Sequence, residues 1–503
     1  MKRIGTFLVL VGLSAAGSAC GPGDASRTAF DDPYCGPLMA KVDSFMATYE
    51  GREWPEDRYG GIAVVGSIGG MEGFDPVTAG EVAPAQHMQF VTHMTLLEFD
   101  HDLEMRPYLA ESWEVSEDRS EVTFHLRNDV FWHDGHPTTA EDVAFTFRVF
   151  SDPASGYPNQ SFFGPYMSEG NGVEVVDTHT VRFRFEPHAD FLETWRGQPI
   201  FPEHLLGDVP VDSLASHPYS TTCPVGNGPY RFVDREIGES WTFGPNLAFP
   251  EALGGRPGLD RYVYRTISDH ATLLAELLAG GVDVFVQMLS NQAETAASED
   301  HLRVWSFPFP SIFFVAWNSR VPELASPDVR RALTLGMDRQ RMIDGVQMGG
   351  ARILNTSLPP VHWAYDSSLD DSLAYDPEQA RALLDGAGWT DRNGDGVREN
   401  ADGTPLEIEL IFNQNQERQE LAELMRLQLQ EIGIRLVPQV MEFGAWRDYT
   451  FGSEKDFEGS LVTFETGFRV DDWDLFHSEA VDGAFALSGT MDPELDRYRI
   501  RSS

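Results

Sequence analysis

The chain is 503 residues long, which is more than one hydrophobic core usually serves, so the sequence predicts two or three domains. With 42% hydrophobic and 12% aromatic residues, it has enough apolar material to fold despite its charge. Its 79 acidic and 37 basic residues give a formal net charge of −42, which argues against nucleic acid as a partner because phosphate binding needs clustered Lys and Arg.

Residues 1–20 read as an export signal, with two cations, an apolar run over 4–13 and small residues before Cys20. The apolar run is too short to span a bilayer, for which about 20 apolar residues are needed, so we expect no transmembrane helix. The small residues ending in Cys20 are similar to a bacterial lipoprotein cleavage site and predict an acylated Cys20 that anchors the chain in the cell envelope or periplasm. The alternative is ordinary secretion after cleavage near Ala19.

Residues 21–59 are predicted to form a spacer with one short helix around 37–49. Two further cysteines, Cys35 and Cys223, remain in the chain. An exported chain with a single possible pair predicts one disulfide, which would attach the spacer to the body of the protein. The alternative is two unpaired, buried thiols.

From Gly60 onwards, short apolar strands alternate with amphipathic helices, which predicts a mixed α/β fold. We expect strands at 61–65 and 173–185, and helices at 327–347 and 377–386. Both helices begin with Ser or Asp followed by Pro, a combination typical of helix starts.

A run of acidic and amide residues nearly matches a calcium-binding loop, whose oxygen ligands come from alternating positions. In chain order, the candidate metal ligands are Asp391, Asn393, Asp395, Glu399 and Asp402. The sequence predicts no cofactor, and a structural calcium ion is the one candidate that it offers. The alternative is a plain hairpin turn, which the Gly-Asp-Gly sequence at 394–396 also favours.

The segment 107–149 carries a dense series of motifs: LAESW at 109–113, VTFHLR at 122–127, HDG at 133–135 and TAEDV at 139–143. Together they resemble the signature segment of the family 5 extracellular solute-binding proteins, the oligopeptide and dipeptide receptors of ATP-binding cassette (ABC) importers. The resemblance covers about residues 60–485. Later matches are GNGPYRF at 226–232, LLAELLAGGVDV at 273–284, FFVAWN at 313–318 and LAELMRLQLQEIGIRL at 421–436.

The resemblance implies a periplasmic-binding-protein-like fold of type II, a three-lobe (cluster C) clam that closes about a hinge. Lobe II is inserted into a discontinuous lobe I, and lobe III follows the hinge strand. Relatives return a further strand and helix to lobe I beyond the last residues of this sequence, so we expect a shortened lobe I. The expected boundaries are 60–83, 190–303 and 485–503 for lobe I, 84–189 for lobe II and 304–484 for lobe III.

The resemblance also implies a function, that of the extracytoplasmic substrate-binding component of an ABC importer. Such a protein captures a short peptide between lobes I and III and delivers it, as a monomer and without catalysis, to the membrane permease and its ATPase. The alternatives are a non-peptide solute, such as an oligosaccharide or a metal chelate, and a chemosensory receptor. An exported hydrolase is a weaker alternative, because the sequence has no G-x-S-x-G or H-E-x-x-H motif.

The loop after the strand at 406–412 and the stretch 463–468 are expected to line the ligand site. Peptide-binding relatives carry in the second stretch an Asp that pairs with the peptide's α-ammonium, and Gly467 stands near that position here. Nearby acids are candidate substitutes, and the alternative is that they are ordinary surface acids. The polar loop is expected to meet a carboxylate at a helix start, and plain turn chemistry explains it equally well. The expected ligand-binding residues are Met71 from lobe I, Asn413, Gln414, Asn415, Phe464, Glu465, Asp471 and Asp472.

Overall fold

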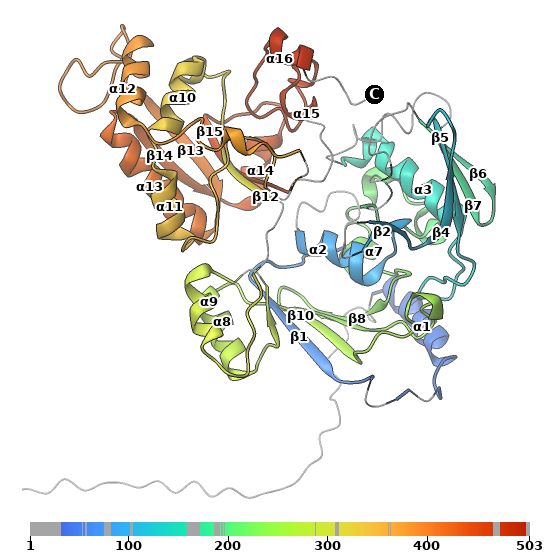
Figure 1. Cartoon of the computed structure of the whole chain (residues 1–503). Coiled ribbons are helices and arrows are strands. Elements are labelled where there is room, and N and C mark those ends of the chain that lie inside the picture. Colours follow the sequence, from blue (N-terminus) through green and yellow to red (C-terminus); the bar gives the residue numbers. More distant parts are fainter. Residues whose placement is uncertain are drawn as a thin grey trace, which may run out of the picture.

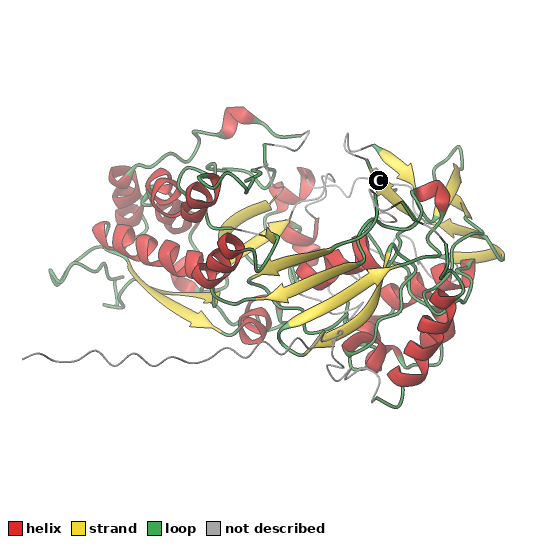
Figure 2. Cartoon of the chain, turned by 90° about the horizontal axis from the view of Figure 1, so that it is seen from below, coloured by secondary structure: helices red, strands yellow, loops and turns green. Residues whose placement is uncertain are grey.

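The computed structural model describes most of the chain beyond the first thirty-one residues. The described residues are 32–52, 54–55, 58–74, 82–100, 104–157, 172–185, 192, 195, 197–286, 288–306, 311–360, 362, 364–465 and 473–498. Within them, the chain forms three larger sheets and one two-stranded sheet, with helices packed beside them (Figure 1). Figure 2 shows the same strands and helices from below.

The first sheet has the strand order β11-β1-β10-β9-β8. β1 runs parallel to β10 and β11, whereas β9 is antiparallel to β10 and to β8. The strands are β1 (Ile62–Ser67), β8 (Tyr230–Glu236), β9 (Ser240–Pro245), β10 (Arg261–Thr266) and β11 (Val284–Phe285). The helices that precede, connect or follow these strands in sequence are α1 (Cys35–Ala47), α2 (Val82–His87), α6 (Glu203–Leu206), α7 (Pro218–Thr221), α8 (His270–Ala279) and α9 (Ser290–Ala297). Two stretches of chain, which flank the second sheet in sequence, therefore build this sheet.

The second sheet is antiparallel throughout, with the order β4-β5-β7-β6, and α3 packs against it. Its elements are β4 (Ala110–Val115), β5 (Glu121–Leu126), α3 (Ala140–Ser151), β6 (Val173–Asp177) and β7 (Thr180–Arg184), and the small sheet beside it consists of β2 (Leu97–Phe99) and β3 (Met105–Pro107). The prediction of one strand over 173–185 was wrong. A turn divides it into a hairpin, because the Asp177 carboxylate accepts the backbone N–H of His179 at 2.8 Å.

A single continuous core joins α1 and the first two sheets. Leu38 of α1, Phe124 of β5 and Trp241 of β9 all belong to this core and are at most 5% exposed. A disulfide between Cys35 and Cys223, whose Cα atoms are 5.8 Å apart, ties α1 to the segment after α7. These parts of the chain therefore form one body, which we call the first body.

The third sheet has the order β12-β15-β13-β14, and its two faces have separate cores. Its strands are β12 (Ser311–Trp317), β13 (Glu407–Asn413), β14 (Arg435–Met441) and β15 (Gly459–Glu465). One face packs against the helices α10 (Pro327–Leu335), α11 (Arg339–Val346), α12 (Pro377–Gly386) and α13 (Gln416–Glu431), and the other against α14 (Phe443–Phe451), while α15 (Trp473–Phe476) and α16 (Pro493–Tyr498) follow. We call this part of the protein lobe III. The expected placement of the residues from 485 onwards in lobe I was wrong, because Leu487 belongs to the core on the α14 side of this sheet and Phe485 packs against Phe464.

The expected helix over 377–386 is present as α12, but the expected helix over 327–347 is two helices. α10 ends before Gly336, and Asp338 then caps α11 by accepting the backbone N–H of Arg341 at 3.0 Å. The backbone N–H of Asp338 donates to Gln428 of α13 at 2.8 Å, which fixes the break against the neighbouring helix. Asp338 thus acts as an N-cap inside a continuous apolar pattern and divides the expected helix into α10 and α11.

Candidate ligand-binding site

The strand directions in lobe III bring four chain segments to one edge of its sheet. β13 runs parallel to β14 and to β15, and β12 is antiparallel to β15. Asn413 pairs with Met441 at the ends of β13 and β14, and Glu465 at the end of β15 pairs with Ser311 at the start of β12. We call this edge the carboxyl edge. Ligands of open α/β sheets bind outside such strand ends.

The predicted polar loop lies at the carboxyl edge. The backbone N–H of Gln414 donates to the carbonyl of Met441 at 3.0 Å. The Asn415 side chain caps α13 by accepting the backbone N–H of Arg418 at 3.0 Å, and the Asn413 side chain accepts a hydrogen bond from the Arg418 guanidinium. The loop therefore forms a turn and caps α13. Its Asn413 side chain also binds the guanidinium of Arg418 and so holds this cation at the carboxyl edge.

Arg418 is a residue of this edge that the sequence interpretation missed. Its guanidinium donates to the Leu461 carbonyl at 3.2 Å and to the Thr463 hydroxyl at 3.0 Å, and it lies 5.5 Å from the ring centre of Phe313 and 5.3 Å from that of Trp446. Burial lowers the pKa of Arg418 to about 10, so the side chain stays charged at neutral pH. Its hydrogen-bond partners among the described residues are all neutral groups.

A signal for Arg418 was present in the sequence. It occupies the third position of α13, where the positive end of the helix dipole disfavours a cation. A cation placed against the dipole, directly after a strand and a run of amides, is a local conflict that indicates function rather than helix stability.

The other predicted ligand residues are placed differently. Phe464 lies near the end of β15, partly exposed, and packs on the α14 side of the sheet. Met71 is 5% exposed within the core of the first body, and its carbonyl accepts the indole N–H of Trp241 at 2.7 Å. The backbone of Glu465 pairs with β12, while the Glu465 side chain, Asp471 and Asp472 lie outside the described residues.

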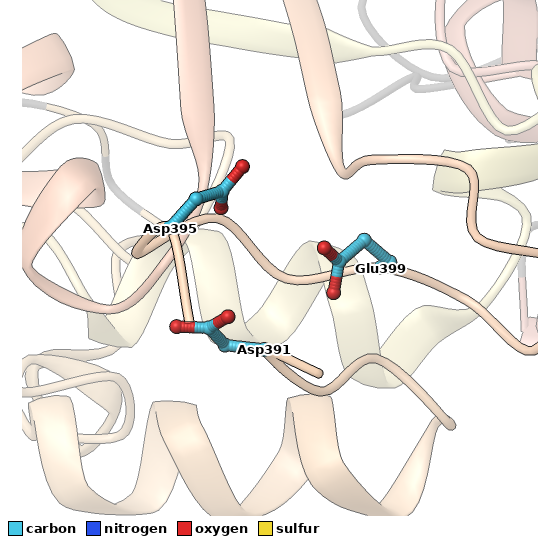
Figure 3. Close-up of side chains that lie close together, drawn as sticks. All are labelled: Asp391, Asp395 and Glu399. Carbon is cyan, nitrogen blue, oxygen red and sulfur yellow. The ribbon is translucent and has the colours of Figure 1, made fainter. Parts of the chain in front are cut away.

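The structure brings together three of the five predicted calcium ligands. Oxygen atoms of Asp391, Asp395 and Glu399 lie within 4.8 Å of one another, and Figure 3 shows the three side chains gathered around one space. Asp391 and Asp395 are exposed and Glu399 is buried. Asp402 does not join this group, and the side-chain amide oxygen of Asn393 accepts the backbone N–H of Asp395 at 2.7 Å.

The predicted turn is present at the same place. Glu399 forms β-bridges with Thr390 and with Pro405, and its carboxylate accepts the backbone N–H of Arg392 at 2.9 Å. The loop is thus closed by its own hydrogen bonds, and its three carboxylates offer the hard oxygen ligands that calcium prefers.

The predicted lipid-attachment residue, Cys20, lies outside the described residues. Among the described helices, none combines the length and the apolar character that crossing a bilayer requires.

An α/β molecule with a separate lobe III, whose carboxyl edge carries a cation and several amides, has the type II architecture of the periplasmic binding proteins. Residues 104–474 match the model of the bacterial extracellular solute-binding proteins, family 5 (middle part), and the chain belongs to this family. The predicted family and fold class are thereby confirmed.

Several relatives are similar over most of the chain. The oligopeptide-binding protein AppA of Bacillus subtilis is 28% identical over 427 residues, which cover 84% of this chain and 77% of AppA. The structure of AppA with a nonapeptide has a TM-score of 0.80 at 26% identity and covers 88% of this chain and 86% of that one. Heme-binding protein A of Haemophilus influenzae is 28% identical over 428 residues, covering 80% of this chain and 73% of that protein.

Proposed function

We propose that the protein is the substrate-binding component of an ABC importer and that it captures a short peptide outside the cytoplasm. Membership of the solute-binding family supports this proposal, and so does the similarity to an oligopeptide-binding protein over 84% of the chain. Closure of lobe III over the first body would hide the peptide from water, and the separate cores of the two parts allow each to move as a rigid unit.

The observation that carries the proposal is the charge of Arg418 at the carboxyl edge. Three neutral acceptors orient its guanidinium, and the neighbouring Glu417 acts on its charge without a hydrogen bond to it. The positive end of α13, a helix of 16 residues, lies at the same edge. A peptide carboxylate that reaches this edge can bind the guanidinium directly, through two parallel hydrogen bonds.

The experiment is a binding assay that combines a ligand screen with variants of Arg418. Mass spectrometry of solute released by denaturation is expected to detect short peptides, and added peptides are expected to raise the melting temperature. The change Arg418→Gln should weaken peptide binding on the order of 30-fold, because it leaves a buried carboxylate unpaired. Arg418→Lys should keep part of the affinity, since it retains the charge and loses the planar fork.

The control is Arg381→Gln in α12, a partly exposed guanidinium on the helix-covered side of lobe III. Its peptide affinity should equal that of the unchanged protein. Stabilisation by oligosaccharides and not by peptides would contradict peptide capture. Equal binding by the Arg418→Gln protein would leave peptide capture standing and remove Arg418 from the site.

The proposal includes the cellular setting of the protein. Acylated Cys20 holds it at the membrane, where it works as a monomer, passes its ligand to a permease with an ATPase, and leaves the peptide chemically intact. The full chain should partition into a detergent phase, whereas Cys20→Ser should move it to the aqueous phase. An anchored Cys20→Ser protein, or peptide fragments after incubation, would contradict this part of the proposal.

A further inference from the structure

The face of the lobe III sheet that carries α14 has an unusual surface. On the opposite face the side chains of Leu410, Phe412 and Leu461 are buried under helices. On the α14 face, four phenylalanine side chains stay partly exposed. We call them the aromatic patch: Phe314, Phe451, Phe464 and Phe485. The four rings lie at the margin of the core that this face forms with α14 and keep part of their surface uncovered, so that an apolar group of a ligand can pack on them.

The rings of the aromatic patch form one connected group. Phe464 lies at its centre, with ring centres 5.1 Å from Phe314, 6.3 Å from Phe451 and 6.0 Å from Phe485. Three of the contacts are edge-to-face, with interplanar angles of 68°, 78° and, between Phe451 and Phe485, 70°. An aromatic side chain of a ligand can pack edge to face on these rings and gains free energy from that geometry as well as from burial. An aliphatic side chain gains free energy from the burial of its apolar surface alone.

The aromatic patch and the cation belong to the same edge of the sheet. Arg418 donates to Thr463, whose side chain lies on the face of β15 opposite to Phe464, and its guanidinium reaches around the strand ends to lie 5.3 Å from the ring centre of Trp446 on the α14 face. The Trp446 ring centre is in turn 5.7 Å from that of Phe451. In Figure 1, β12 and α14 lie on the side of lobe III turned towards α2 of the first body. A ligand with its carboxylate on Arg418 therefore has the aromatic patch within reach of its nearest side chains.

We propose that the peptide ligand carries an aromatic side chain close to its carboxylate, and that Phe464 and Phe485 select it. This inference rests on the proposed function and narrows its substrate class. The selection is for aromatic side chains because a ring that packs edge to face on the phenylalanine rings gains more binding free energy than an aliphatic side chain does.

The test compares two tetrapeptides, Ala-Ala-Ala-Phe and Ala-Ala-Ala-Leu, by calorimetric titration of the full chain. The phenylalanine peptide should bind about threefold to tenfold more tightly, the range that aromatic pairing adds to burial. Phe464→Leu and Phe485→Leu keep an apolar side chain and remove the ring. In each variant the two peptides should bind with nearly equal affinity. The affinity for the leucine peptide itself should change by less than about twofold.

The control is Tyr375→Leu, an exposed aromatic residue just before α12, which should retain the full ratio. Circular dichroism checks that each variant is folded. If the unchanged protein binds the phenylalanine peptide no more tightly than the leucine peptide, the inference is overturned and peptide capture stands. The same holds if the preference for the phenylalanine peptide persists in both the Phe464→Leu and the Phe485→Leu proteins. Absence of binding for both peptides in the unchanged protein would contradict peptide capture and the inference together.

Discussion

Three buried histidines of the first body are held as neutral groups. His87 bonds to the Tyr262 hydroxyl at 2.7 Å, His93 to that of Tyr219 at 2.7 Å, and His133 to a backbone carbonyl at 3.0 Å. Burial lowers the pKa of His87 to about 4, of His93 to about 3 and of His133 to about 4. Their neutral forms fit the core, and their protonated forms do not.

The stability of the fold should therefore depend on pH through these side chains. Above about pH 6.5 both the folded and the unfolded chain carry neutral histidine, so the contribution is present in full. As the pH falls below 6.5, these histidines become protonated in the unfolded chain but stay neutral in the folded chain. The free energy of unfolding therefore falls progressively until the pH reaches the folded pKa values. Replacing one of them, as in His93→Gln, should flatten this dependence.

The measurement is urea denaturation of both proteins at about pH 7.5 and about pH 5. Between these values the free energy of unfolding should fall by about 2 kcal/mol less in the His93→Gln protein than in the unchanged one. Changes in the repulsion among surface acids are common to both proteins and cancel in this difference. His301→Gln, at an exposed position, should follow the unchanged protein. Identical pH slopes in all three would show that His93 is not held neutral.

The loop with Asp391, Asp395 and Glu399 gives a second prediction at this scale. If these carboxylates hold calcium, the ion should raise the melting temperature and a chelator should lower it again. Asp391→Asn should abolish this shift because it removes charge from the group. Asp402→Asn should leave the shift in place, because Asp402 stands outside the group. A melting temperature insensitive to calcium would favour the plain turn.

At the scale of elements, glycines mark where backbones approach closely. A Cβ atom built on Gly226 would lie 1.7 Å from the backbone carbonyl oxygen of Thr92, which leaves no room for a side chain. Gly345 lies inside α11, and a Cβ atom there would meet nothing within 4 Å. The two positions therefore predict opposite effects of the same change.

Gly226→Ala should destabilise the fold by several kcal/mol, because the backbone has to shift within a buried core. Gly345→Ala should stabilise it by about 0.5 to 1 kcal/mol, because alanine loses less conformational freedom in a helix. Urea denaturation of the two variants measures both effects. A Gly226→Ala protein as stable as the unchanged one would mean that the two segments are not in contact.

The elements that were predictable from sequence are those with local signals. Asp376 caps α12 by accepting the backbone N–H of Gln379 at 2.9 Å, and that helix has the expected bounds. The two errors arose where an interior residue changes the local structure, as Asp338 does between α10 and α11. Periodicity continues across such a residue and hides the break. Strand directions, which create the carboxyl edge, have no local signal, so the role of Arg418 emerged only from the assembled sheet.

At the scale of the whole molecule, the disulfide closes a sequence separation of 188 residues. Cross-linking over so long a loop restricts the unfolded chain strongly, so its removal should be costly. Changing Cys35 and Cys223 together to serine should lower the free energy of unfolding by about 2 to 5 kcal/mol. Urea denaturation with and without a reductant checks this. A reductant should affect the unchanged protein only, and equal stability of both proteins would contradict the prediction.

The disulfide also determines which part of the molecule is joined to the N-terminal segment. α1 is covalently joined to the first body, whereas lobe III has cores of its own. Any attachment upstream of Cys35 therefore pulls on the first body and not on lobe III. With the lipid anchor that we propose at Cys20, the first body would be the part held at the membrane and lobe III the part that moves, so an importer that senses closure would have to read the position of lobe III.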